Sequence, residues 1–349
     1  MKPLFSIVIP CYNSGQTLNR LLDSIANQDM KDDIEVILAD DASIIIYDYY
    51  IDKYKDKLNI KYIGSDKHYG YPGPIRELGA SIATGKYITF IDHDDEFIDH
   101  IFSRIKSIIE KNCPLIIYSY LKIYKDKEEY RYKDKVLSSE DLIDKKYFNS
   151  GLLHGKFFNL KYFWRFYDIH FSDIKTNEDI YIMNIIKCLA KYHDINIHEC
   201  DFCTYIWYNN PDSLSHSNLT FSEKPTNYLE LNFHDYMIKT SQVFVDFYKR
   251  EMLDKGSAMV TLVDYCVRGY VYLQIFMNLY DNDYIETNID VCREQLNQIK
   301  ELFDINNTNI LYIVDKYNLY EAIDIASQKY NMKYTFEEWL EFLDNKEDQ

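Results

Sequence analysis

The chain has 349 residues, which is long enough for a complete hydrophobic core and more natural for two or three packed units than for one. Hydrophobic residues make up 47% and charged residues 27%, a balance that excludes wholesale disorder. A formal net charge of −17 argues against nucleic acid and anionic membrane as main partners, because both attract basic surfaces. No stretch approaches the roughly 20 apolar residues of an integral membrane segment.

The amino-terminal segment MKPLFSIVIP combines one Lys with a short apolar run, so we expect a first β-strand there and no secretion signal. Seven cysteines are scattered without the spacing of a disulfide framework, which is typical of reduced thiols. Cys200 and Cys203 form one CxxC with no second pair, which favours buried thiols over structural zinc. These features predict a cytoplasmic protein.

The first third of the chain alternates apolar runs with helical periods. Strands are expected at 5–9, 34–39, 60–63 and 87–91, and helices after 13–14, near 46–53 and at 75–82. Strand–helix–strand repeats of this length predict an α/β fold with a Rossmann-like, mostly parallel sheet and helices on both faces. Such sheets bind ligands beyond the carboxyl ends of their strands.

The pattern then loosens and becomes helical. Strands are expected near 152–158 and 204–208, a helix at 178–190, and amphipathic helices at 226–253, 257–280, 284–303 and 309–330. We therefore divide the chain into an α/β domain at 1–218 and a C-terminal α-helical domain at 219–349. Within the first domain, 1–118 is expected to be the nucleotide-binding half and 119–218 the acceptor half.

Acidic pairs follow two of the expected strands and open one expected helix. Asp40-Asp41 lies after the second strand, where a turn with an Asx cap is the simpler reading and a contact to a base or ribose the functional one. Glu178-Asp179 begins a helix, where the macrodipole favours acids and would also keep a carboxylate ionised as a general base.

A denser cluster, Asp92-His93-Asp94-Asp95, follows the strand at 87–91. Three carboxylates in four residues repel one another unless a cation offsets their charge. Hard oxygen ligands in a short loop suit Mg²⁺ or Mn²⁺, which also bind substrate phosphates. The alternative is a solvated loop that caps the next helix. The position at a strand end favours the metal.

Together the ordered segments resemble the large family-two inverting glycosyltransferases, which have the GT-A fold. The matching pieces are Ser6–Asn13, Asp40–Ser43, Arg76, Ala83–Asp95, His154–Lys156, Glu178-Asp179 and Asn210–Ser215. The resemblance covers about residues 4–218, and its specificity lies in the order of the set.

The resemblance implies a role for each matched residue. The uracil and ribose of a UDP-sugar would be held by Pro10, Tyr12, Asp41 and Arg76, with Asp40 beside them and Asp92 on the ribose or sugar. Asp94 would coordinate Mn²⁺ or Mg²⁺ on the diphosphate, with Asp95 and His216 as further candidate ligands. Asp179 would be the general base. Contacts to donor or acceptor would come from Lys156, Glu178, Ser213 and Ser215.

Three departures from the family pattern concern the diphosphate and the sugar. Glu77 stands where the family usually has Asn, and Ile44-Ile45 replaces the usual Thr-Asp. The Arg often found near Tyr208 is absent from that loop, so a metal is expected to carry more of the leaving-group charge.

We therefore expect an inverting transferase that moves a hexose or N-acetylhexosamine from UDP to a hydroxyl of a cell-surface glycan or of a protein such as flagellin. The alternatives are a nucleotidyltransferase and a non-catalytic nucleotide-sugar-binding or scaffold protein. A nucleotidyltransferase would want a Gly-rich basic loop after the first strand, and Pro10–Gly15 has one Gly and no basic residue. The helices of 219–349 could simply complete the core of the chain, but we expect them to help select the acceptor or to hold a homodimer.

Overall fold

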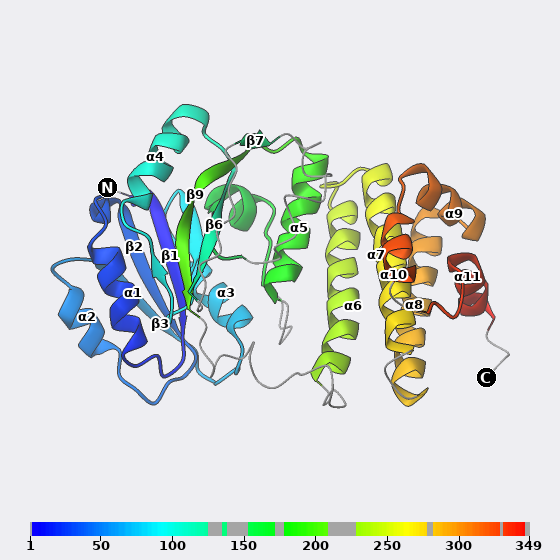
Figure 1. Cartoon of the computed structure of the whole chain (residues 1–349), viewed down its shortest axis with the longest axis horizontal. Coiled ribbons are helices and arrows are strands. Elements are labelled where there is room, and N and C mark those ends of the chain that lie inside the picture. Colours follow the sequence, from blue (N-terminus) through cyan, green and yellow to red (C-terminus); the bar gives the residue numbers. More distant parts are fainter. Residues whose placement is uncertain are drawn as a thin grey trace. The chain divides into compact units, whose positions relative to one another are not determined.

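The structure is a computed structural model that describes residues 2–124, 135–137, 153–171, 178–208, 228–277, 282–328 and 331–345. The chain forms two compact units, Met1–Asn218 and Leu219–Gln349. The first combines a sheet with helices and the second is helical (Figure 1).

The first unit is built on four parallel strands in the order β3-β2-β1-β4. They are β1 (Phe5–Cys11), β2 (Ile34–Asp40), β3 (Asn59–Gly64) and β4 (Tyr87–Phe90). Every residue of β1, β2 and β4 is buried. Both faces of these strands are covered, and this explains why their sequences are nearly continuous apolar runs.

Helices cover both faces of this parallel half (Figure 1). The face that carries Phe5, Ile7 and Ile9 packs in one core with α1 (Thr17–Ala26), α2 (Asp48–Tyr54) and α4 (Ile101–Asn112). The opposite face receives α3 (Pro72–Ile82), which also contacts α5 (Glu178–Tyr192). Helix α3 lies so close to the sheet that a Cβ on Gly79 would be 2.4 Å from Cγ1 of Val8.

Beyond β4 the sheet becomes mixed. β8 (Lys156–Asn159) is antiparallel to β4, and the order continues through β6 (Ile116–Tyr124), β9 (Ile197–Tyr208) and β5 (Glu96–Phe97). β7 (Lys135–Leu137) pairs with β9. Short helical turns lie at Lys31–Asp33 and Lys161–Phe166. The predicted α/β fold is therefore confirmed, with the parallel pattern concentrated in the first four strands.

The second unit consists of helices in the residues that the structure describes. They are α6 (Tyr228–Lys249), α7 (Lys255–Met277), α8 (Asn282–Phe303), α9 (Asn307–Lys316), α10 (Glu321–Ser327) and α11 (Phe336–Asp344). The single helix expected at 309–330 is two helices, because Tyr317–Tyr320 form turns between them. The unexpected α11 begins with a capping box in which Thr335 and Glu338 bond each other's backbone amides.

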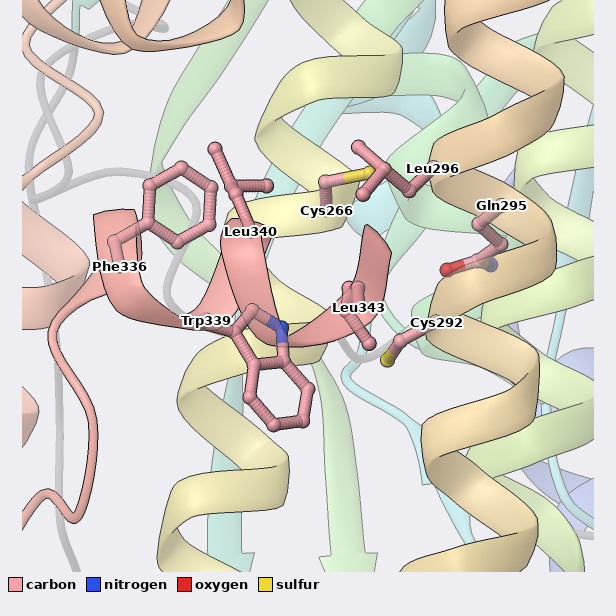
Figure 2. A pocket seen from close by; sticks show the side chains of 8 residues that line it. All are labelled: Cys266, Cys292, Gln295, Leu296, Phe336, Trp339, Leu340 and Leu343. Carbon is pink, nitrogen blue, oxygen red and sulfur yellow. The ribbon is translucent and has the colours of Figure 1, made fainter. Parts of the chain in front are cut away.

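Helix α11 completes the core of the second unit. Trp339, Leu340 and Leu343 point toward Cys266 of α7 and Cys292 of α8 (Figure 2). The cavity among these side chains measures about 10 Å³, which is room for about one water molecule. This space is a packing defect and too small for an organic ligand.

The seven cysteines form no disulfide. Cys200 and Cys203 are buried in β9, and among the seven Cys113 alone is exposed. Burial raises the pKa of the Cys11 and Cys266 thiols to about 12. The six cysteines other than Cys113 are buried, so their thiols are unreactive and serve as packing groups in the folded chain.

In the described ranges, no helix has the length and apolar character required to cross a membrane.

Candidate active site

Two loops, one after β1 and one after β2, are hydrogen-bonded to each other at the carboxyl ends of the parallel strands. Asn13 after β1 and Ala42 after β2 adopt left-handed backbone conformations, with φ of 48° and 54°. The amide of Asn13 donates to Oγ of Ser43 at 2.8 Å, and the amide of Ile44 donates to Oδ1 of Asn13 at 3.0 Å. Asn tolerates the left-handed region and its amide completes the link, so this edge is held by local bonds.

Asp40 is buried and bound within its own loop. Its carboxylate accepts bonds from the Ser43 amide at 3.2 Å and from the Tyr62 hydroxyl at 2.9 Å. The Ser43 hydroxyl donates to it as well, at 2.5 Å. These contacts match the Asx turn considered for this position, and a nucleotide contact by Asp40 stays a prediction. Pro10, which is also buried, lies near the end of β1 and pairs with Ala39, the residue before Asp40 on β2.

Asp41 lies next to a pair of stacked rings, those of Tyr12 and His68. Its Oδ1 accepts from the Tyr69 amide at 2.7 Å and its Oδ2 from the Gly70 amide at 2.9 Å. Nδ1 of His68 lies 2.9 Å from the same Oδ2. The His68 ring is stacked on Tyr12, with centroids 4.0 Å apart and an angle of 19° between the planes. Two predicted nucleotide ligands, Tyr12 and Asp41, therefore share His68 as a neighbour.

A buried guanidinium joins three motifs that are distant in sequence. Arg76 of α3 donates from Nη1 to Glu178 Oε1 at 2.5 Å and from Nη2 to Asp92 Oδ1 at 2.8 Å. His154 lies against the other oxygen of Asp92, with Nε2 3.2 Å from Oδ2. Arg76 is only 2% exposed. The structure thus brings together α3, the acidic loop after β4, the loop before β8 and the start of α5.

The charges of this cluster shift its pKa values strongly. Burial alone would raise the pKa of Asp92, but His154 and Arg76 outweigh burial and hold that pKa well below its usual range. Burial lowers the pKa of His154, yet the Asp92 carboxylate outweighs it and the net shift is upward. Burial, and secondarily Asp179, raises the pKa of Glu178 to about 7 even though Arg76 opposes the shift.

Asp95 is bonded to residues of β9 and not to Arg76. It is buried, accepts bonds from the Tyr205 hydroxyl and from the Tyr208 amide at 2.8 Å, and its pKa is raised to about 7 by burial and by Asp92. These contacts tie the acidic loop to the end of β9. Asp94 of the same loop is partly exposed and is therefore more accessible to a metal than the buried Asp95.

An arginine of α1 holds the backbone of the same loop. Arg20 donates from Nη2 to the carbonyl oxygen of Asp94, and its guanidinium carbon lies 3.8 Å from the centre of the Tyr208 ring. The Tyr208 hydroxyl donates to Glu96 at 2.7 Å. The segment near Tyr208 itself lacks the Arg that is often found there in the family, but Arg20 brings a guanidinium to the Tyr208 ring from α1.

Lys156 and Asp179 complete the set of predicted residues that the structure describes. Lys156 is buried at the start of β8, where burial and the nearby Lys187 lower its pKa to about 7. Asp179 is half-buried in the first turn of α5. Ser213, Ser215 and His216 lie outside the described residues. Within the described residues, no three His, Cys, Asp or Glu side chains are grouped to hold a metal ion.

Three residues of the site were missed by sequence reasoning. His154 belonged to a quoted motif but had no role assigned, while His68 and Arg20 carried no signal at all. Glu77, which was noted only as a departure, accepts a bond from the Phe171 amide at 3.0 Å and pairs with His170 at 2.8 Å. It therefore anchors the segment that leads toward α5.

Residues 6–172 match the sequence profile of Glycosyl transferase family 2. A poly(ribitol-phosphate) beta-N-acetylglucosaminyltransferase, TarS, of Staphylococcus aureus is 37% identical over 92 residues, which is 26% of this chain and 16% of that protein. A GalNAc(5)-diNAcBac-PP-undecaprenol beta-1,3-glucosyltransferase of Campylobacter jejuni is 27% identical over 159 residues, 45% of this chain and 51% of the relative. The matched segments thus span about half or less of these relatives.

The fold resembles solved structures over nearly its whole length. The crystal structure of residues 1–349 of S. aureus TarS in complex with UDP-GlcNAc has a TM-score of 0.67 at 18% identity, covering 94% of this chain and 92% of that one. The complex of the same protein with UDP has a TM-score of 0.65. At 18% identity, this likeness establishes the fold alone.

Proposed function

We propose that this chain, which belongs to glycosyl transferase family 2 through residues 6–172, transfers a sugar from a UDP-sugar to a hydroxyl acceptor with inversion. The observation that carries the proposal is the buried Arg76, which joins Asp92 to Glu178. Through these bonds the loop predicted to face the donor is fixed beside the helix start that carries the predicted base. Donor and acceptor chemistry would thereby meet at one edge of the sheet.

The proposed reaction is a single displacement. Asp179 removes the proton of the acceptor hydroxyl as its oxygen bonds to the anomeric carbon, and the bond from that carbon to the diphosphate breaks on the opposite face. UDP leaves with the bonding electron pair. Glu178 orients the start of α5 by its contact with Arg76, so the neighbouring Asp179 is presented to the acceptor.

A divalent cation fits this site through one protein carboxylate. Asp94 would hold Mn²⁺ or Mg²⁺, because it is partly exposed in the loop after β4 and is the residue to which the family resemblance assigns the metal, whereas Asp95 of the same loop is buried. The ion would neutralise the negative charge that develops on the diphosphate. Substrate oxygens and water would fill its other positions, as Mg²⁺ commonly requires.

The donor is proposed to carry a hexose or an N-acetylhexosamine, and the acceptor to be a cell-surface glycan. Support comes from the names of the relatives, which act on poly(ribitol-phosphate) and on an undecaprenol-linked glycan. No feature of the described residues favours a protein acceptor such as flagellin over a glycan.

Incubation of the purified chain with a panel of UDP-sugars and Mn²⁺ tests the proposal. We expect slow release of UDP, suppression by EDTA, and loss of both turnover and metal-enhanced UDP binding in Asp94→Ala. Release of pyrophosphate would instead identify a nucleotidyltransferase. UDP-sugar binding without any product would identify a non-catalytic binding protein. Unchanged turnover of Asp94→Ala in EDTA would remove the metal from the mechanism.

A further inference from the structure

The His68 side chain makes two contacts that are typical of a bound nucleobase. Its ring stacks nearly parallel on Tyr12 at 4.0 Å, and its Nδ1 lies 2.9 Å from Oδ2 of Asp41. A uracil ring also offers a flat π face and one ring N–H beside it, so it could make the same pair of contacts with Tyr12 and Asp41.

There is no space for a third ring between these two. Stacked aromatic planes need about 3.5 Å of separation from each neighbour, and the Tyr12 and His68 centroids are already in stacking contact at 4.0 Å. A base that uses this face of Tyr12 must therefore take the position that the imidazole occupies.

The carboxylate of Asp41 leads to the same conclusion. Oδ2 receives the Gly70 amide at 2.9 Å and Oδ1 receives the Tyr69 amide at 2.7 Å, while Nδ1 of His68 lies 2.9 Å from Oδ2 and 3.2 Å from the backbone carbonyl oxygen of Asp41. The two amides belong to the backbone and fix the orientation of the carboxylate. The His68 side chain is the partner that can leave, because it is 44% exposed and rotation about its own bonds carries it into solvent.

We propose that His68 is an intramolecular stand-in for the nucleobase, which a binding nucleotide must displace. This rests on the proposed function, since it takes Tyr12 and Asp41 as the base site. In the free chain His68 keeps the Tyr12 ring and the Asp41 carboxylate in their binding geometry. The contacts that it gives up reduce nucleotide affinity, and they also disfavour bases that cannot replace both of them.

The sign of the affinity change tests the proposal. Calorimetric titration with UDP and Mn²⁺ should show that His68→Ala binds UDP more tightly than the original chain, by about three- to tenfold, the usual worth of one aromatic pair. His68→Phe keeps a ring on Tyr12 and should gain less than His68→Ala. Weaker binding by His68→Ala would make His68 a direct ligand of the base and overturn the proposal, as would an unchanged Kd.

A matched control is available in the same unit. His193 is exposed and lies against another tyrosine ring, Tyr167, with centroids 5.3 Å apart, so His193→Ala removes a comparable contact away from the base site. It should leave the UDP Kd unchanged. Equal thermal stability of the two variants would show that any gain in affinity belongs to the base site.

A second measurement follows the ring directly. The Cε1 proton of His68, assigned by its loss in His68→Ala, should be shifted upfield by the Tyr12 ring current and should move downfield when UDP saturates the chain. A signal that stays upfield at saturation would contradict displacement. If the original chain binds no UDP, the proposed function itself fails. If it binds UDP while His68 stays stacked, only the stand-in role fails.

Discussion

At the scale of single residues, the site depends on ion pairs and hydrogen bonds between residues that are distant in sequence. Arg76, Asp92 and Glu178 were all predicted as site residues because they belong to ordered motifs. Their mutual contacts were not predictable, since they arise when α3, the loop after β4 and α5 converge. His154 shows the same limit, because nothing local indicates that its ring lies 3.2 Å from Asp92.

The first prediction concerns Asp179. Asp179→Asn removes the proposed base but keeps the size and polarity of the side chain, so UDP binding and the fold should persist. Multiple-turnover assays with the natural acceptor should show a loss of at least about 100-fold, the usual contribution of a general base. Asp194→Asn, an exposed change just beyond α5, is the control. Retained turnover with a collapse of donor binding would assign Asp179 to binding instead.

The second prediction uses the raised pKa of His154. A histidine whose folded pKa is raised contributes stability that is fully present below its unfolded pKa of about 6.5 and is lost as the pH rises through the folded value. His154→Gln should therefore cost about 1.5–3 kcal/mol in urea unfolding at pH 6, the range for a hydrogen bond to a charged group, and clearly less at pH 9. A difference that stays constant or grows with pH would show that His154 is not held as a cation by Asp92.

At the scale of elements, the first half of the sheet was predicted more completely than the second, in which the strands expected near 152–158 and 204–208 overlap β8 and β9 but β6 was missed. β1, β2 and β4 are short apolar runs because helices cover both of their faces, so their sequences carry the signal. β6 was missed although Ile116–Tyr124 is rich in Ile and Tyr, which are enriched in strands, and only its shifted register with β9 between Tyr118 and Leu121 was beyond local sequence patterns. Helix α4 was not placed either, although Ile101, Ile105 and Ile109 recur with helical spacing.

Helix α1 is predicted to position the acidic loop through Arg20. Arg20→Ala removes the donor to the Asp94 carbonyl and should raise the KM for the UDP-sugar about tenfold while the fold is kept, because one charge-assisted bond is lost. Arg20→Lys should recover part of the loss. Arg104→Ala is matched, since Arg104 stacks 3.5 Å from the centre of Phe202 on the exposed side of α4. Equal effects of the two alanine variants would reduce the role of Arg20 to general stability.

Because α3 lies close to the sheet, we expect alanine substitutions at two glycines, one in α3 and one in α7, to differ in their effect on stability. Gly79→Ala places a Cβ 2.4 Å from Val8 and 3.2 Å from Ala39, and it should lower the free energy of unfolding by about 1–3 kcal/mol. UDP binding should weaken as well, since Arg76 lies on the same helix. Gly256→Ala in the first turn of α7 places a Cβ 3.2 Å from Oδ1 of Asp254, an exposed side chain that can shift, so this substitution should cost less stability than Gly79→Ala. Equal thermal stability of the two variants would contradict the packing argument.

At the scale of the whole molecule, two units each have their own core. Leu262, Val263 and Trp339 are buried within the second unit, which contains none of the described residues of the proposed site. The chain shortened after Asn218, if it stays folded, should bind UDP and slowly hydrolyse the donor but fail to modify the natural acceptor. Full transfer by the shortened chain would remove the proposed role of residues 219–349 in acceptor selection. Sedimentation of the full chain as a monomer would remove their role in a dimer.

Because each unit contains buried thiols, the unfolding of each unit can be followed separately by thiol labelling. A maleimide dye should label the native chain once, at Cys113, which lies at the end of α4. Cys11 can react only after the sheet opens, and Cys292 only after α11 leaves its place against α7 and α8. Pulse labelling along a denaturant series, read by peptide mass, would therefore reveal whether the α/β unit and the helical unit unfold together or in succession.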